Sequence, residues 1–288
     1  MKVRKKSHLK NYFGFKNLKK IIITWKSNMG ILSDKKGVIL GVGNQRSIAW
    51  AVAEHFHEQG AEIALTYLAD PKGRFEANVR KLGDKVNASL IQECDVSNDD
   101  SIQSLLDALN NHWGELDFLI HSLAFADQKD LQVDFSSTSR GGYAKAHEIS
   151  AFSLLPLAEG VIPMMKKRGG GSILSMSFIG SLLAVPHYHV MGPAKASLES
   201  SSRYLAKEVG PENIRVNVIS PGAIRTLSSA GIKDFAELMR VAGEHSAMKR
   251  TATQDEVAQT AVFLASEASS GITGQVIYVD CGYSIMAN

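Results

Sequence analysis

Short apolar runs alternate with helical segments along nearly the whole chain, and this alternation limits the fold more than any other feature. The runs occupy residues 38–42, 61–67, 88–94, 116–121, 171–176, 214–219 and 275–280 and are almost continuously hydrophobic. Strands of this kind are buried on both faces, as in a parallel sheet with helices on each side. No Pro/Gly-rich linker interrupts the chain after residue 30. We therefore expect a single doubly wound α/β domain with a seven-stranded parallel sheet.

Helices are expected between these runs. Apolar residues at helical spacing predict them at 47–60, 74–82, 97–113, 142–167, 190–209 and 254–266. Ser97 is the expected N-cap of the third helix. Residues 224–244, after the sixth strand, are expected to form a loop with short helices.

The first 28 residues differ in charge from the rest of the chain. They contain nine Lys or Arg and no Asp or Glu, so removing them from the net +3 leaves residues 29–288 at −6. A mildly acidic body argues against nucleic acid as the main partner. The basic segment is a targeting segment, a basic arm or an upstream extension of the reading frame. We favour an extension that is disordered or absent from the native protein, with the domain at 29–288.

The two cysteines, Cys94 and Cys281, are too few for a disulfide framework. Such usage suggests a reducing compartment, and we expect a cytoplasmic protein. The apolar run at residues 21–25 is far too short to cross a membrane, and no longer run suggests a span. We therefore expect no membrane association.

Residues 41–49 form a glycine-containing turn between the first strand and the first helix. Gly41 and Gly43 let the backbone approach a pyrophosphate, and the helix N-terminus stabilises its charge. Arg46 occupies the place of the third glycine in the G-x-G-x-x-G fingerprint, so the match is incomplete. The segment indicates a dinucleotide site, with an ordinary tight turn as the alternative.

Three further strand ends carry small or polar residues. Asp95, after the third strand, can accept a hydrogen bond from an adenine amino group beside Val96; a helix N-cap is the alternative. Residues 121–126 follow the fourth strand, at the expected cofactor crevice. Residues 220–226 follow the sixth strand, where small residues and backbone amides can hold a carboxamide and a phosphate.

Tyr188 and Lys195 lie seven residues apart, where a helical run begins after an apolar strand. We expect them about two helical turns apart at most, with side chains on the same side. A phenol beside an ammonium is the proton-donating end of a reductase site, whereas a buried Tyr and a surface Lys are the alternative.

His187 and His189 flank the Tyr without a carboxylate or thiolate nearby in sequence, so we expect no metal site.

Taken together, these motifs resemble the short-chain dehydrogenase/reductase superfamily, and within it the bacterial enoyl-[acyl-carrier-protein] reductases. The segments that carry the resemblance are 41–49, 94–96, 121–126, 146–150, 188–195, 215–220, 224–226, 231–235 and 274–280. The resemblance covers residues 30–288 and implies a Rossmann fold.

The spacing from Tyr to Lys separates the branches of that superfamily. Ordinary members carry Tyr-x3-Lys, but Met191 occupies that position here and has no proton to give. Tyr188 instead gives Tyr-x6-Lys, as in the enoyl reductases. A carbonyl reductase protonates an oxygen on the carbon that receives hydride, whereas an enoyl reductase meets an enolate oxygen farther away. The relocated phenol suits the second reaction.

The resemblance implies reduction of the trans-2 double bond of an enoyl thioester on acyl carrier protein, the last step of a fatty-acid elongation cycle. Hydride would pass from NADH to the β-carbon, while Tyr188 stabilises the enolate oxygen and Lys195 binds the nicotinamide ribose. A homotetramer and a mobile lid over residues 226–235 are also implied. The cofactor-binding residues so implied are Gly41, Ser47, Ile48, Leu68, Asp95, Val96, Leu123, Lys195, Ile224 and Thr226, and the substrate-binding residues are Ala126, Phe178 and Tyr188.

Two positions depart from the family pattern. Phe178 stands where a second Tyr is usual, and we expect it to pack against substrate or nicotinamide, leaving Tyr188 as the donor. Leu68 ends the second strand where NADH-using relatives often carry Gln. No Asp, Glu or Arg stands there, but Lys72 and Arg74 are close in sequence, so NADH is favoured and NADPH stays open.

Two alternatives to an enoyl reductase remain. One is a reductase of other carbonyl or enoyl substrates, and the other is a dinucleotide-binding regulatory protein without catalysis.

Overall fold

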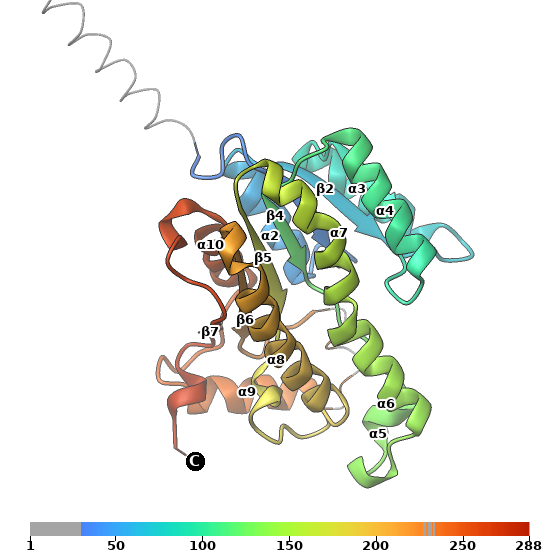
Figure 1. The fold of residues 1–288 in the computed structure, drawn as a ribbon. Coiled ribbons are helices and arrows are strands. Elements are labelled where there is room, and N and C mark those ends of the chain that lie inside the picture. The colour runs from blue at the N-terminus through green and yellow to red at the C-terminus, as the bar shows by residue number, and fades with distance from the viewer. Residues whose placement is uncertain (1–29, 227–228, 230–231, 233, 288) are drawn as a thin grey trace, which may run out of the picture.

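Seven parallel strands form one sheet at the centre of the molecule (Figure 1). The computed structural model describes residues 30–226, 229, 232 and 234–287. The strands are β1 (Lys36–Leu40), β2 (Glu62–Tyr67), β3 (Leu90–Glu93), β4 (Phe118–His121), β5 (Gly171–Met176), β6 (Ile214–Pro221) and β7 (Val276–Val279). Their order across the sheet is β3-β2-β1-β4-β5-β6-β7. The predicted doubly wound fold and all seven strands are therefore confirmed.

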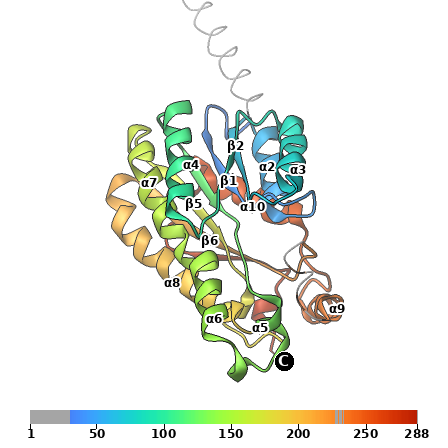
Figure 2. The same ribbon diagram turned by 90° about the vertical axis from the view of Figure 1, so that its right-hand side faces the viewer.

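Helices cover both faces of this sheet. They are α2 (Ile48–Glu58), α3 (Arg74–Gly83), α4 (Asp99–His112), α5 (Gln128–Gln132), α6 (Arg140–His147), α7 (Leu154–Lys167), α8 (Met191–Val209), α9 (Phe235–His245) and α10 (Gln254–Ala265). One apolar core lies under α2, α3 and α10, and the other under α4, α7 and α8 (Figure 2). Helices α5, α6 and α9 lie beyond the carboxyl ends of the strands.

The strand order reverses at β1, which pairs with β2 on one side and β4 on the other. Val38 is opposite Ala64 of β2 and Leu119 of β4. In an open parallel sheet, the chain leaves the carboxyl ends of such neighbours toward opposite faces, and a crevice opens between them. The fold thus places a binding site at the ends of β1 and β4.

Three details of the predicted helices were wrong. Asn98, not Ser97, is the N-cap of α4, because its side chain accepts the hydrogen bond from Ser101 N–H at 3.1 Å. The long run begins at Arg140 and contains a π-helical turn, Glu148–Phe152. The expected loop with short helices at 224–244 contains the 11-residue helix α9, whose hydrophobic spacing a loop assignment overlooked.

The continuous helical run Arg140–Lys167 has 28 residues and, by length and composition alone, is apolar enough to cross a membrane. No such run was expected, since polar residues interrupt its sequence. Half of its most apolar window is buried inside the protein, where α7 packs on α4, β4 and β5. The apolarity of the run is thus explained by its place in the core.

Some predictions fall outside the described residues. These are the basic extension at 1–28 and five positions of the predicted lid, namely 227, 228, 230, 231 and 233.

Candidate active site

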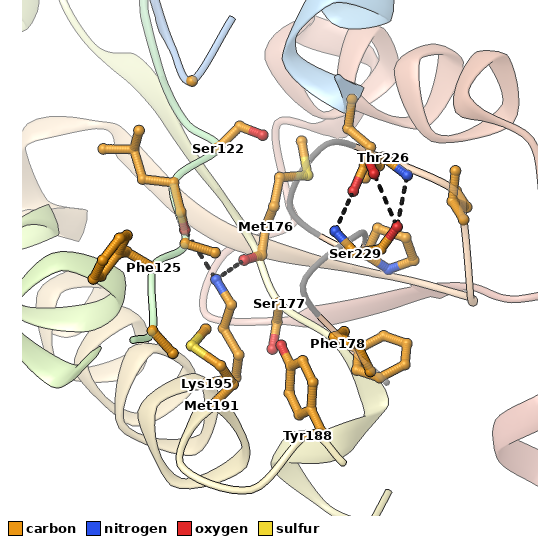
Figure 3. Close-up of a pocket in the computed structure, with 18 of the residues that line it drawn as sticks. Ser122, Phe125, Met176, Ser177, Phe178, Tyr188, Met191, Lys195, Thr226 and Ser229 are labelled. Atoms are coloured by element: carbon orange, nitrogen blue, oxygen red, sulfur yellow. Dashed lines mark hydrogen bonds between the residues drawn. The ribbon is translucent and has the colours of Figure 1, made fainter. Parts of the chain in front are cut away.

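A cavity of about 590 Å³ opens at the carboxyl ends of β1, β4, β5 and β6. Figure 3 shows how its side chains converge from these strand ends and from α8. The lining residues are Gly41, Gly43, Ser47, Ile48, Ser122, Leu123, Ala124, Phe125, Ala126, Gln128, Leu131, Met176, Ser177, Phe178, Tyr188, Met191, Lys195, Pro221, Gly222, Ile224, Thr226, Ser229, Ile232 and Phe235. Ten of the thirteen predicted site residues therefore meet in one cavity.

The turn after β1 is packed tightly against the end of β4. Gly41 has φ +97°, a left-handed conformation that strains any residue with a side chain. A Cβ there would lie 2.1 Å from the carbonyl oxygen of Ser122. Only glycine permits this approach, which brings the β1 turn and the β4 end together at the cavity.

Ser47 is the N-cap of α2 and leads the helix directly away from that turn. Its hydroxyl donates to the carbonyl of Asn44 at 2.6 Å, so it fixes the turn and leaves the first helical N–H groups free. Ile48, the first residue of α2, also lines the cavity. A helix N-terminus of this kind favours an anionic ligand.

Ser150 on the π-helical turn and Ser153 directly after it hold the end of β4 and the loop that follows. The Ser150 hydroxyl accepts from Phe125 N–H at 3.0 Å and donates to Phe125 C=O at 3.2 Å. The Ser153 hydroxyl donates to Ile149 C=O and contacts Nε2 of His121 at 2.8 Å. Because the Ser153 proton is already committed, His121 donates from Nε2. Burial, and then the charge of Lys195, lower the His121 pKa to about 3, so this imidazole stays neutral.

Lys195 enters the cavity from α8 and is only 3% exposed. Its Nζ donates to the carbonyls of Met176 at 2.8 Å and Leu123 at 3.1 Å (Figure 3). An ammonium has three N–H donors, so one remains for a ligand after these two bonds. Burial lowers the Lys195 pKa to about 8, while the charge of Glu199 opposes that shift.

Tyr188 lines the cavity from a turn that precedes α8, which begins at Met191. The predicted helix 190–209 likewise leaves Tyr188 before its start, and both side chains reach the same cavity as expected. Both neighbours of the Tyr have positive φ, 60° at His187 and 38° at His189. Backbone strain of this kind concentrates at functional sites, and here it lets the chain turn Tyr188 inward.

Phe178 contacts Tyr188 edge to face, with ring centroids 4.9 Å apart and planes at 64°. Such a pair contributes about 0.5–1.5 kcal/mol beyond its buried area. Burial, and then Glu199, raise the Tyr188 pKa above its usual range. The phenol therefore keeps its proton at neutral pH and is held in place by an aromatic neighbour.

Thr226 closes the cavity beside β6. Its Oγ1 accepts from Ser229 N–H at 3.1 Å, and its N–H donates to Ser229 Oγ at 2.8 Å. Among the described residues no acceptor takes the Thr226 hydroxyl proton, so it can be donated to a ligand. Of the predicted lid, the described residues Thr226, Ser229, Ile232 and Phe235 line the cavity.

Three predicted cofactor residues, Leu68, Asp95 and Val96, lie outside the cavity at the ends of β2 and β3. Leu68 is 52% exposed. Asp95 accepts from the N–H and hydroxyl of Ser97 at 2.9 and 2.7 Å, so it caps a turn, whereas α4 is capped by Asn98. Their roles toward an adenosine stay predictions.

Sequence reasoning assigned no role to several lining residues. Ser177 follows a predicted strand directly, which was a usable signal, and Met191 was considered only as a failed proton donor. Gln128 and Leu131 come from the short helix α5, whose five residues carry too little periodicity to reveal which of them face a site.

Lys195 is the one charged side chain among the described residues that line the cavity. Within the described part of the chain, no three His, Cys, Asp or Glu side chains are grouped as metal ligands. The cavity thus combines a cation, a helix N-terminus and backbone donors with apolar walls. This donor set fits a dinucleotide with a pyrophosphate.

The sheet order, the glycine turn and the buried Tyr/Lys pair define a protein of the short-chain dehydrogenase/reductase class. A family model described as "Enoyl-(Acyl carrier protein) reductase" matches residues 41–284. The chain belongs to this enoyl-(acyl carrier protein) reductase family.

Individual relatives agree with that assignment. The enoyl-[acyl-carrier-protein] reductase [NADH] FabI of Nostoc sp. is 50% identical over 255 residues, or 88% of this chain and 98% of that protein. The Anaplasma phagocytophilum enoyl reductase, solved with NAD, has a TM-score of 0.86 at 40% identity and covers 91% and 98% of the two chains. The Bacillus cereus enzyme, solved with NADP+ and indole naphthyridinone, has a TM-score of 0.86 at 43% identity and covers 90% and 100%.

Proposed function

We propose that the protein reduces the trans-2 double bond of an enoyl thioester carried on acyl carrier protein, the last step of a fatty-acid elongation cycle. The observation that carries this proposal is the placement of Tyr188 and Lys195 in one cavity, with Met191 at the position of the ordinary proton donor. Membership of the enoyl-(acyl carrier protein) reductase family supports it.

A nicotinamide cofactor, when bound, supplies the hydride. Gly41, Ser47 and Ile48 surround the helix N-terminus that suits the pyrophosphate. Lys195 has one free N–H for a ribose hydroxyl, and Thr226 a free hydroxyl proton for a phosphate or amide oxygen.

Tyr188 acts on the thioester. As hydride arrives at the β-carbon, negative charge develops on the thioester oxygen, and the protonated phenol donates a hydrogen bond to it. A proton that comes ultimately from solvent then adds to the α-carbon, and the enolate returns to the saturated thioester. The raised Tyr188 pKa keeps that proton in place. Lys195 adds positive charge nearby. The apolar side chains of Ala126, Phe178 and Ile232 would exclude water from the acyl chain.

NADH is the proposed cofactor. Arg74, the cation near the end of β2, is paired with Asp70 through its Nε at 3.4 Å. Asp70 also accepts from the backbone N–H groups of Lys72 and Arg74, both at 2.9 Å. The carboxylate offsets the charge of the guanidinium near the end of β2, so this region attracts a 2′-phosphate less, which disfavours NADPH.

A homotetramer in the cytoplasm is the proposed state. Phe152, Leu155 and Tyr204 are 56%, 37% and 77% exposed on the run Glu148–Phe152, on α7 and on α8. Exposed aromatic and aliphatic side chains on neighbouring helices favour burial against other copies of the chain. Cys94 and Cys281 are both free, as expected in a reducing compartment. Analytical ultracentrifugation tests the assembly, and a monomer at micromolar concentration would refute it.

The direct test follows NADH and NADPH oxidation with crotonyl and longer trans-2-enoyl thioesters, beside matched β-ketoacyl thioesters. We expect turnover of the enoyl substrates with NADH. Turnover of the keto substrates alone would favour the ordinary short-chain reductases. Tight cofactor binding without any turnover would favour a regulatory protein.

A further inference from the structure

Glu199 is a buried acid beside the site and has no part in the mechanism above. It lies on α8, four residues after Lys195, and is 5% exposed. Side chains four residues apart lie on the same face of a helix. An acid at such depth is rare unless a polar partner compensates its desolvation.

Ser177 is that partner. Its hydroxyl donates to Oε1 of Glu199 at 2.5 Å, the short distance typical of a hydroxyl bonded to a carboxylate. Ser177 follows β5 directly, is 7% exposed and lines the cavity (Figure 3). Because its only proton is committed to Glu199, the Ser177 oxygen can act only as an acceptor toward the cavity.

The Glu199 charge also reaches the reacting groups. It raises the pKa of Lys195 against the effect of burial. Other titratable groups face this region from the loop before α8, from β4 and from the end of β7. Burial is the main cause that raises the pKa of Tyr188 and of Tyr278, and the negative charge of Glu199 adds to it. The charge of Asp280 raises the Tyr278 pKa further. His121 lies on the other side of Lys195 and is neutral.

We propose that Glu199 is a positioning residue of the reductase site, which commits the Ser177 hydroxyl to itself and supplies the counter-charge that keeps Lys195 protonated at neutral pH. This deepens the proposed function and rests on it for its catalytic consequence. Ser177 would then accept a hydrogen bond from a ribose hydroxyl of the bound cofactor, because the Tyr188 proton is directed to the thioester oxygen. Lys195 would keep its charge despite its burial.

The first test does not depend on turnover. Lysine labelled with ¹³C at Cε is incorporated, and Lys195 is titrated by NMR in the full chain without cofactor, its signal assigned with Lys195→Arg. We expect a wild-type midpoint near about 8, the value at which burial and the opposing Glu199 charge together hold the Lys195 pKa. Glu199→Gln keeps an acceptor for Ser177 and removes the charge, so the midpoint should fall by about one to two pH units at one helical turn's separation. A shift of less than about 0.3 unit would overturn the proposal.

The matched variant Ser177→Ala keeps the carboxylate and removes the hydroxyl. Its Lys195 midpoint should stay at or above that of wild type, whereas KM for NADH should rise about tenfold through the lost hydrogen bond to the ribose. In Glu199→Gln, the basic limb of kcat/KM for NADH should move down in pH with the NMR midpoint. A purely structural role would lower the melting temperature and reduce rates equally at all pH values, and this result would contradict the proposal.

The outcomes separate the two claims. If the Lys195 midpoint moves but wild type reduces no enoyl thioester, the counter-charge stands and the proposed function fails. If wild type turns over and the midpoint does not move, the function stands and the role of Glu199 fails. Should Glu199→Gln not fold, Ser177→Ala decides, since an unchanged KM for NADH in that variant would also overturn the proposal.

Discussion

Replacing Gly41 with Ala tests the close approach between the β1 turn and the end of β4. The new Cβ would lie 2.1 Å from Ser122 O and 2.8 Å from its carbonyl carbon. Ordinary carbon–oxygen contacts are about 3.3 Å, so the turn must move by roughly 1 Å. The φ of +97° adds strain for any L residue.

The two effects together should destabilise the protein by about 2–4 kcal/mol, because left-handed strain and overpacking each cost roughly 1–3 kcal/mol. For a domain of this size, that lowers the melting temperature by about 5–15 °C. A displacement of 1 Å in the turn should also lower kcat/KM for NADH by about 100-fold. Differential scanning calorimetry and steady-state kinetics measure the two effects separately.

Gly169→Ala is the matched control. Gly169 has φ +77° and nothing within 4 Å of its added Cβ. It lies between α7 and the amino end of β5, whereas the cavity lies at the carboxyl ends of the strands. The control therefore carries the conformational strain without the clash, and should lose about 1–2 kcal/mol with unchanged kinetics. Equal effects of the two variants on NADH kinetics would refute the argument from close approach.

Three further predictions follow from the site and its surroundings. Phe178→Tyr should keep the edge-to-face contact and change kcat by about threefold at most. Phe178→Ala should destabilise by about 1–3 kcal/mol in thermal melts, less than a fully buried Phe, because Phe178 is only partly buried. A greater loss of kcat in the Tyr variant would show that the cavity requires the Phe. Asp70→Asn should release Arg74 and raise the NADPH/NADH ratio of kcat/KM by about three- to tenfold, and an unchanged ratio would contradict the proposed cofactor preference. Hydrogen bonds from Arg250 lower the Glu256 pKa to about 2, so the stabilisation from the Glu256 carboxylate is present above its ordinary pKa of 4.5 and is lost as pH falls toward 2. Glu256→Gln should therefore lower the free energy of unfolding by about 1 kcal/mol at pH 7. In urea melts, the difference between this variant and wild type should shrink as the pH is lowered.

The sheet could be predicted from sequence because its strands are buried on both faces and therefore appear as unbroken apolar runs. The run at 171–176 matches β5 residue for residue. The glycine turn and the strand ends also placed most of the cavity, since parallel strands bring their carboxyl ends to one edge.

Other features depend on tertiary contacts that have no local signal. Tyr188 is turned inward by two left-handed residues, His187 and His189, which no sequence spacing indicates. The π-helical turn looks like ordinary helix in sequence, yet it sets Ser150 against the β4 loop. The bond between Ser177 and Glu199 joins residues 22 apart on different elements, which no short motif reveals.

The enolate-stabilising role of Tyr188 is the central claim, and Tyr188→Phe tests it most directly. The substitution removes one hydroxyl and keeps the ring that contacts Phe178. Initial rates with a trans-2-enoyl thioester, beside NADH affinity from fluorescence titration, separate chemistry from binding. We predict a loss of about 100- to 1,000-fold in kcat with an unchanged Kd for NADH. A kcat equal to that of wild type would contradict the mechanism.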